Sequence, residues 1–129
     1  MGRLIDEAGQ ILATEPAGTR QLEALIRGQV AFAIDDSYLV RLWQREVHVL
    51  PEADRRRLRR LQRLYVEEWV HLLAELRPGL GDGQARALVH AAIGAIQSVA
   101  SYNSGLPRKQ QADLLDRAAW ACLDCGLAS

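Results

Sequence analysis

The sequence has little of the features that mark several large classes of protein. None of its apolar runs approaches the ~20 residues needed to cross a bilayer, and no basic, apolar and small-residue signal peptide opens the 129-residue chain. Neither sign of charge is in excess, because 16 basic residues balance 16 acidic ones. Domains that bind nucleic acid through their overall charge are usually strongly basic. We therefore expect a cytoplasmic protein that neither enters a membrane nor binds nucleic acid through its net charge.

The sequence also lacks the residue patterns of the common catalytic sites. His48, His71 and His90 fall on different predicted elements, and neither a glycine-rich phosphate loop nor a serine nucleophile elbow is present. Glu67 and Glu68 are neighbours on a helix surface and do not form an acid–base pair. The sequence therefore predicts no enzyme, no cofactor and no metal site.

Cysteine is scarce, and the two residues present form a single C-x-x-C motif at Cys122 and Cys125. Two thiols three positions apart on a helix share a face and could bind a metal or form a redox pair. The motif has no second C-x-x-C and lies at a helix end without a neighbouring βα unit. Small side chains at a contact between helices are the favoured interpretation, and a thiol sensor stays open as an alternative.

What the sequence does have is apolar residues at helical spacing along its whole length. Hydrophobic residues make up 49% of the chain, and no stretch alternates between apolar and polar residues as a strand does. Thr19 is a plausible N-cap, and Pro51 and Pro107 stand near helix starts. The sequence therefore predicts one all-α domain over residues 1–129, with six helices at residues 3–14, 21–34, 37–47, 51–77, 82–103 and 107–125.

Alanine is concentrated in the last two predicted helices. A helix as apolar around its girth as residues 85–102 must be buried on more than one side. A domain of this size has limited room to bury both helices by itself. We therefore expect a homodimer in which they form a four-helix bundle with a second protomer, the alternative being two core helices of a monomer. The predicted interface residues are Ala87, Ala91, Ala95, Leu115, Ala118, Ala119 and Cys122.

Six arginines are packed into residues 55–63 of the long predicted helix. Helical spacing places Arg56, Arg60 and Arg63 on one face, as a phosphate-binding stripe would require. Leucines interleave them, however, and Glu52 and Glu67 lie four positions from Arg56 and Arg63, where ion pairs can form. A solvated, salt-bridged helix face is the favoured interpretation.

Several stretches of the chain resemble a known domain: RLRRLQRLYV at residues 57–66 with WV at 69–70 and LRP at 76–78, and ARALVHAAIG at 85–94 with SGLP at 104–107. They resemble the C-terminal effector-binding and dimerisation domain of TetR/AcrR-family transcriptional regulators. The resemblance covers nearly the whole chain. It implies a transcriptional regulator of the repressor type that forms a homodimer.

The resemblance also implies a separate DNA-binding domain. Members of this family begin with a helical domain that contains a helix-turn-helix, and residues 1–129 do not supply one. Residues 3–14 correspond to the helix that connects the two domains. Operator DNA is therefore an expected partner of the full-length protein, through a missing N-terminal domain, and not of this chain itself.

A cavity for a small-molecule effector is the third implication of the resemblance. In the family, the effector lies among three helices, which in this chain carry Phe32, Trp43, Tyr65 and Trp69. His90, Ile93 and Gln97 share one face of a later helix. An apolar wall without a charged cluster indicates a small lipophilic effector, whose binding would shift the connecting helices and the spacing of the DNA-binding domains. The alternative is an autonomous dimerisation module whose aromatic residues are core. The candidate ligand residues are Phe32, Trp43, Tyr65, Trp69, His90, Ile93 and Gln97.

Overall fold

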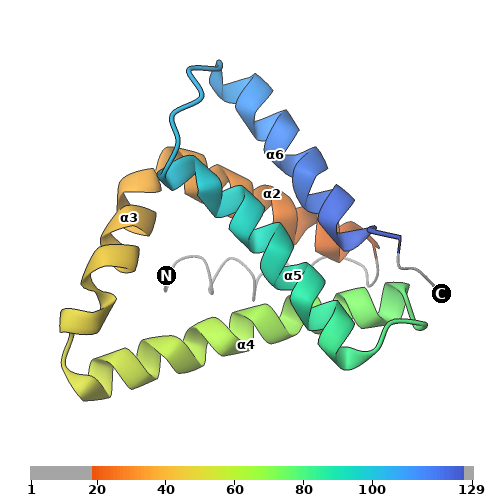
Figure 1. Cartoon of the computed structure of the whole chain (residues 1–129), viewed down its shortest axis with the longest axis horizontal. Coiled ribbons are helices and arrows are strands. Elements are labelled where there is room, and N and C mark those ends of the chain that lie inside the picture. The colour runs from red at the N-terminus through yellow and green to blue at the C-terminus, as the bar shows by residue number, and fades with distance from the viewer. Residues whose placement is uncertain (1–18, 127–129) are drawn as a thin grey trace.

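The structure is a computed structural model that describes residues 19–126, and this part of the chain is helical, without a strand. In Figure 1, α4 forms one side of a triangle, α2 and α5 form the second, and α3 joins their ends as the third. The all-α prediction is confirmed, whereas the helix predicted at residues 3–14 lies outside the described residues. The helices are α2 (Thr19–Asp35), α3 (Ser37–Glu46), α4 (Glu52–Leu76), α5 (Asp82–Gln97) and α6 (Arg108–Leu123), with short 3-10 helices η1 (Val47–Val49) after α3 and η2 (Ser98–Ala100) after α5.

The predicted end of the fifth helix at residue 103 was wrong, because α5 stops at Gln97. The Ser98 hydroxyl donates to the Ala95 carbonyl (2.6 Å), and the Ser101 hydroxyl donates to the Ser98 carbonyl (3.2 Å). Side-chain bonds of this kind compete with the α-helical ladder. The chain therefore tightens into η2 and turns toward α6 through Gly105, whose φ of +72° is in the left-handed region that favours glycine.

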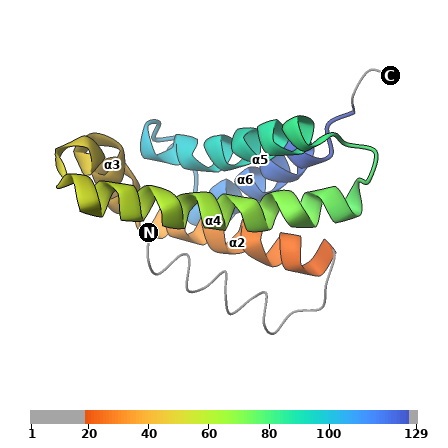
Figure 2. The ribbon, with the colours of Figure 1, turned by 90° about the horizontal axis from the view of Figure 1, so that it is seen from below.

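The core gathers where α5 contacts α2, α4 and α6. α5 buries Ala85, Val89, Ala92 and Ile96 at steps of three and four residues. Two of these are alanines, so neighbouring helices can approach the α5 backbone closely. Figure 2, seen from the side of α4, shows α2 and α5 on either side of that helix. Trp69 of α4 is the largest side chain of this core and has no exposed surface.

α4 is buried in its C-terminal half and exposed in its N-terminal half. Its buried residues all lie between Tyr65 and Leu73, and the arginines of residues 55–63 are exposed except for the half-buried Arg55. This exposure agrees with the interpretation of the run as a solvated face.

None of the helices in residues 19–126 is long and apolar enough to span a membrane.

One of the two ion pairs predicted along α4 is present. Glu52 and Arg56 lie 3.2 Å apart. Glu67 binds Arg86 of α5 instead of Arg63, because it faces α5 across the contact between the two helices. Arg86 also reaches Asp82 at 3.4 Å, so this cluster joins the start of α5 to α4.

α2 and α6 are held together at one end by a bidentate ion pair. The Arg108 guanidinium donates to both carboxylate oxygens of Asp35, at 2.7 and 2.8 Å. These hydrogen bonds, assisted by the charge of the guanidinium, hold the pKa of Asp35 below its usual value. At the other end of α6, Arg77 donates to the Leu123 carbonyl at 2.7 Å, which satisfies a carbonyl that the helix end leaves unpaired.

Asp116 is an unfavourably placed charge on α6. Its Oδ1 atom is buried without a hydrogen-bond partner among the described residues. This desolvation raises the pKa of the carboxyl; Arg27 opposes the rise, and Asp113 and Glu23 add to it. The ionised form of Asp116 therefore lowers the stability of the fold at neutral pH.

We expect Asp116→Asn to raise the free energy of unfolding at pH 7. The folded-state pKa lies above the unfolded value of 3.8, so the wild-type chain regains stability as the pH falls through the folded-state pKa, and the advantage of the variant shrinks there. Urea unfolding at pH 7 and at about pH 4 measures the free energy of unfolding of both proteins, and thus the advantage of the variant at each pH. The exposed Glu68→Gln is the control, and an Asp116→Asn protein less stable than wild type at pH 7 would contradict the prediction.

Candidate functional site

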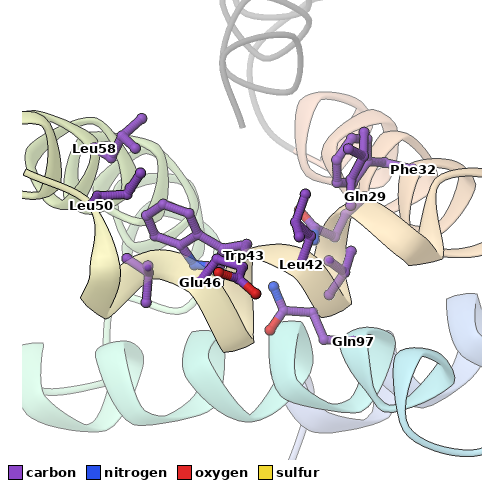
Figure 3. A pocket seen from close by; sticks show the side chains of 11 residues that line it. Gln29, Phe32, Leu42, Trp43, Glu46, Leu50, Leu58 and Gln97 are labelled. Carbon is purple, nitrogen blue, oxygen red and sulfur yellow. The ribbon is translucent and has the colours of Figure 1, made fainter.

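A cavity of about 310 Å³ lies among α2, α3, the start of α4 and the end of α5. Its wall is mostly apolar with a few polar groups, which is typical of sites for small molecules. In Figure 3 the side chains come from all four helices and surround one space. This α2–α3 cavity is lined by Gln29, Phe32, Leu39, Val40, Leu42, Trp43, Glu46, Val47, Leu50, Leu58 and Gln97.

The cavity exists because α3 packs loosely against the rest of the domain. Val40 is the one buried residue of this helix; Trp43 is half-buried, and Leu42 keeps 45% of its surface exposed. Ten residues are too few for a stable isolated helix. α3 is therefore held by its connections, including the hydrogen bond from Arg55 of α4 to the His48 carbonyl (3.0 Å).

A buried hydrogen bond supports the α2 side of the cavity. The Tyr65 hydroxyl donates to Gln29 Oε1 at 2.7 Å, and both side chains are buried. The Tyr65 ring also packs edge-on against Trp69, with ring centroids 6.1 Å apart and planes at 65°. The three residues form a connected path from the centre of the core to the cavity wall. Gln29 therefore presents its amide at a defined position in the cavity.

The structure brings together part of the predicted ligand set. Phe32, Trp43 and Gln97 line the α2–α3 cavity. Tyr65 and Trp69 are core residues that stand behind its wall, where Tyr65 contacts the lining residue Gln29. Those two aromatics therefore shape the cavity without lining it.

His90 and Ile93 face a different space, a hollow of about 440 Å³ between α4 and α5. As predicted, they share a helix face with Gln97, which lines both spaces. The shared face turns mainly toward α4, so it meets the charged side chains there. This α4–α5 groove is lined by Gln62, Arg63, Val66, Glu67, Arg86, His90, Ile93, Gly94 and Gln97.

Gln29 is not among the predicted ligand residues, although the sequence carries a signal for it. Leu22, Leu25 and Ile26 form the buried stripe of α2, and Gln29 continues that stripe at helical spacing. A polar residue in an apolar stripe needs a partner, so its position in the stripe marks Gln29 as a candidate. Glu46 carried no such signal, because its place at the cavity depends on the angle at which α3 crosses the domain.

The predicted dimer-interface residues divide by exposure. Ala87, Ala91 and Ala118 are exposed, and Ala95, Leu115 and Cys122 are half-buried. Ala119 is fully buried, so it belongs to the core of the single chain. The exposed and half-buried members recur every three or four residues, so they form one apolar row on α5 and another on α6.

Cys122 and Cys125 are free thiols at the end of α6, the first half-buried and the second exposed. Within residues 19–126, no cluster of three or more histidine, cysteine or acidic side chains is arranged to hold a metal ion.

A comparison with protein families gives a match over most of the chain. The family described as "Tetracyclin repressor-like, C-terminal domain" matches residues 15–103. This range includes every residue that lines the α2–α3 cavity. No helix-turn-helix domain is identified in the chain. A search of curated proteins finds no match.

We expect Tyr65→Phe to lower the free energy of unfolding by about 2 kcal/mol, because it leaves the buried Gln29 Oε1 without its donor. Tyr38→Phe removes a hydroxyl from a tyrosine that is 58% exposed and is the matched control. Urea unfolding measures both variants. Adding Gln29→Met to Tyr65→Phe should restore much of the loss, since both partners are then apolar. A Tyr65→Phe variant no less stable than Tyr38→Phe would contradict this account.

Proposed function

We propose, since the chain belongs to the family of Tetracyclin repressor-like C-terminal domains, that it is the ligand-binding and dimerisation domain of a TetR-type transcriptional repressor. The ligand is a small lipophilic molecule held in the α2–α3 cavity. Its binding changes the affinity of the full-length dimer for operator DNA. The family is one of regulator domains and not of enzymes, so the cavity is assigned to binding and not to catalysis.

The observation that carries this proposal is the apolar cavity beside a loosely packed helix. Its volume of about 310 Å³ falls at the lower end of the ~300–1,000 Å³ common for small-molecule sites. Phe32 and Trp43 offer aromatic surfaces, and Gln29 and Gln97 are the neutral polar groups that can orient a ligand. A ligand that covers Leu42 and Trp43 would remove apolar surface that α3 otherwise leaves in water.

Coupling to DNA would run through α2. This helix supplies Gln29 and Phe32 to the cavity wall, and its 17 residues form a rigid rod that begins at Thr19. A ligand that favours one placement of α3 against α2 shifts the population toward that placement. A change in the position of α2 would move the residues that precede it in the chain. In the family, the DNA-binding domain precedes this region.

Dimerisation is proposed through the outer faces of α5 and α6. Ala87 and Ala91 are exposed one turn apart on α5, and on α6 the exposed Ala118 lies next to Leu114, which is 53% exposed. Small side chains let helices of two protomers approach closely, and their burial removes apolar surface from water. A four-helix bundle with two-fold symmetry would bury the outer faces of both helices at once.

Binding of N-phenyl-1-naphthylamine, a neutral dye that fluoresces in apolar surroundings, tests the cavity. We expect saturable binding to the wild-type chain, and about tenfold weaker binding to Trp43→Ala, because the variant loses an aromatic wall. Tyr102→Ala is the control, since Tyr102 is 71% exposed and does not line the cavity. Equal dye affinity in wild type and Trp43→Ala would place the dye elsewhere and contradict the proposal.

Sedimentation velocity tests the dimer. We expect the wild-type chain to sediment as a dimer and Ala91→Glu as a monomer, because the variant buries a charge at the interface. Ala74→Glu introduces the same charge at an exposed alanine of α4 and should leave the dimer intact. A monomeric wild-type chain, or a dimer that survives Ala91→Glu as well as Ala74→Glu, would rule out this interface.

A further inference from the structure

Charge is distributed unequally around the α2–α3 cavity. Of its eleven lining residues, Glu46 is the one that carries a charge at neutral pH, and no basic side chain lines the wall. Two polar residues, Gln29 and Gln97, are neutral amides, and the rest of the wall is aromatic or aliphatic. The cavity is therefore an apolar space with a single negative group.

The Glu46 carboxylate takes part in no ion pair within residues 19–126. Arg41 donates to the Ser37 hydroxyl (3.4 Å), and Arg55 donates to the His48 carbonyl (3.0 Å). Arg45, which precedes Glu46 in the chain, forms no ion pair with it. Glu46 itself is exposed, so its carboxylate is accessible to solvent. The Glu46 carboxylate has no charged partner among residues 19–126, so a positively charged group of a ligand would be its first.

The surroundings of this carboxylate suit a cation with an apolar body. Figure 3 shows Glu46 beside Trp43 on α3, with the amide of Gln97 from α5 next to them, and Phe32 and Leu58 toward opposite ends of the space. An indole face attracts organic cations through its quadrupole, so Trp43 adds to the attraction that the neighbouring Glu46 carboxylate exerts on a positively charged group. The apolar ends accommodate the uncharged part of such a ligand.

The same arrangement disfavours an anionic ligand. A carboxylate, sulfonate or phosphate head would lie near Glu46 without a basic side chain in the wall to pair with, and like charges in a partly desolvated site repel each other. A neutral lipophile meets no repulsion but makes no use of the carboxylate.

We propose that the ligand of the α2–α3 cavity is a lipophilic organic cation, with an ammonium group at Glu46 and Trp43 and an apolar body against the aromatic and aliphatic residues of the wall. This proposal rests on the proposed ligand-binding function and adds the charge of the ligand to it. Glu46 is the residue that determines specificity for charge, and Trp43 contributes to the affinity for any aromatic ligand.

The test is competition against the bound neutral dye N-phenyl-1-naphthylamine by two probes of similar shape and opposite charge. The cationic probe is (naphthalen-2-ylmethyl)trimethylammonium, and the anionic probe is naphthalen-2-ylmethanesulfonate. We expect the cation to displace the dye at a concentration at least about tenfold lower than the anion. Added salt should narrow this difference, because it screens a partly exposed carboxylate.

Glu46→Gln keeps the size of the side chain and removes its charge. We expect the affinity of this variant for the cation, relative to its affinity for the dye, to fall about tenfold. Glu68→Gln, which changes an exposed carboxylate of α4 outside the cavity, should leave this ratio as it is in wild type. An anion that competes as well as the cation, or a cation preference that survives Glu46→Gln, overturns the charge proposal while dye binding leaves the ligand-binding function standing. If the dye does not bind, the cation is titrated directly by calorimetry, and no binding there overturns both proposals.

Discussion

The hydrogen bond from Tyr65 to Gln29 Oε1 connects the core of this domain to its cavity. A buried glutamine is tolerated only when its polar atoms are satisfied, and here the donor comes from α4 at 2.7 Å. That contact sets how α2 and α4 face each other beside Trp69, the largest fully buried side chain. It also determines which part of α2 closes the cavity, because Phe32 follows Gln29 by one helical turn. If the two helices were displaced from each other, the bond would break and the α2 wall would move with it.

The domain combines a tight core with a loosely packed helix, and the proposed ligand site lies between them. α5 lies against three other helices through alanine, valine and isoleucine, so the part that contains α2, α4, α5 and α6 is closely packed. α3 adds one buried residue to that core and spans the ends of α2 and α4 (Figure 1). Elements with few buried apolar contacts have low local stability. The cavity is thus placed where a bound molecule can change the position of one helix without disrupting the rest.

Periodicity and helix-breaking residues sufficed to predict the helices of residues 19–126, because they report on local structure. The break between α2 and α3, the start of α4 near Pro51 and the start of α6 after Pro107 follow from residues adjacent to each boundary. The end of α5 was missed because the hydroxyl of Ser98 bonds the backbone there. Helix faces were also predicted: His90, Ile93 and Gln97 do share one.

Which neighbour each face meets could not be predicted in the same way. His90 and Ile93 face α4 instead of the cavity, and Ala119 points into the core while the adjacent Ala118 is exposed. Both outcomes depend on helix crossing angles that arise from packing the whole domain. The position of Glu46 at the cavity also depends on packing, because the orientation of α3 brings it there and no local motif does. Patterns in the sequence therefore identify which faces exist, and tertiary packing decides their partners.

The three tryptophans provide the most direct measurement of the central claim, that the space between α2 and α3 is the ligand site. Trp43 lines that cavity, Trp69 lies in the core, and Trp120 lies on α6 beside other surface hollows. Titration of a neutral lipophile into ¹⁵N-labelled protein, followed by the indole N–H signals, reports on each location separately. If the cavity is the ligand site, the Trp43 signal shifts first and furthest while the Trp120 signal is unchanged. A shift of Trp120 with an unperturbed Trp43 would contradict it.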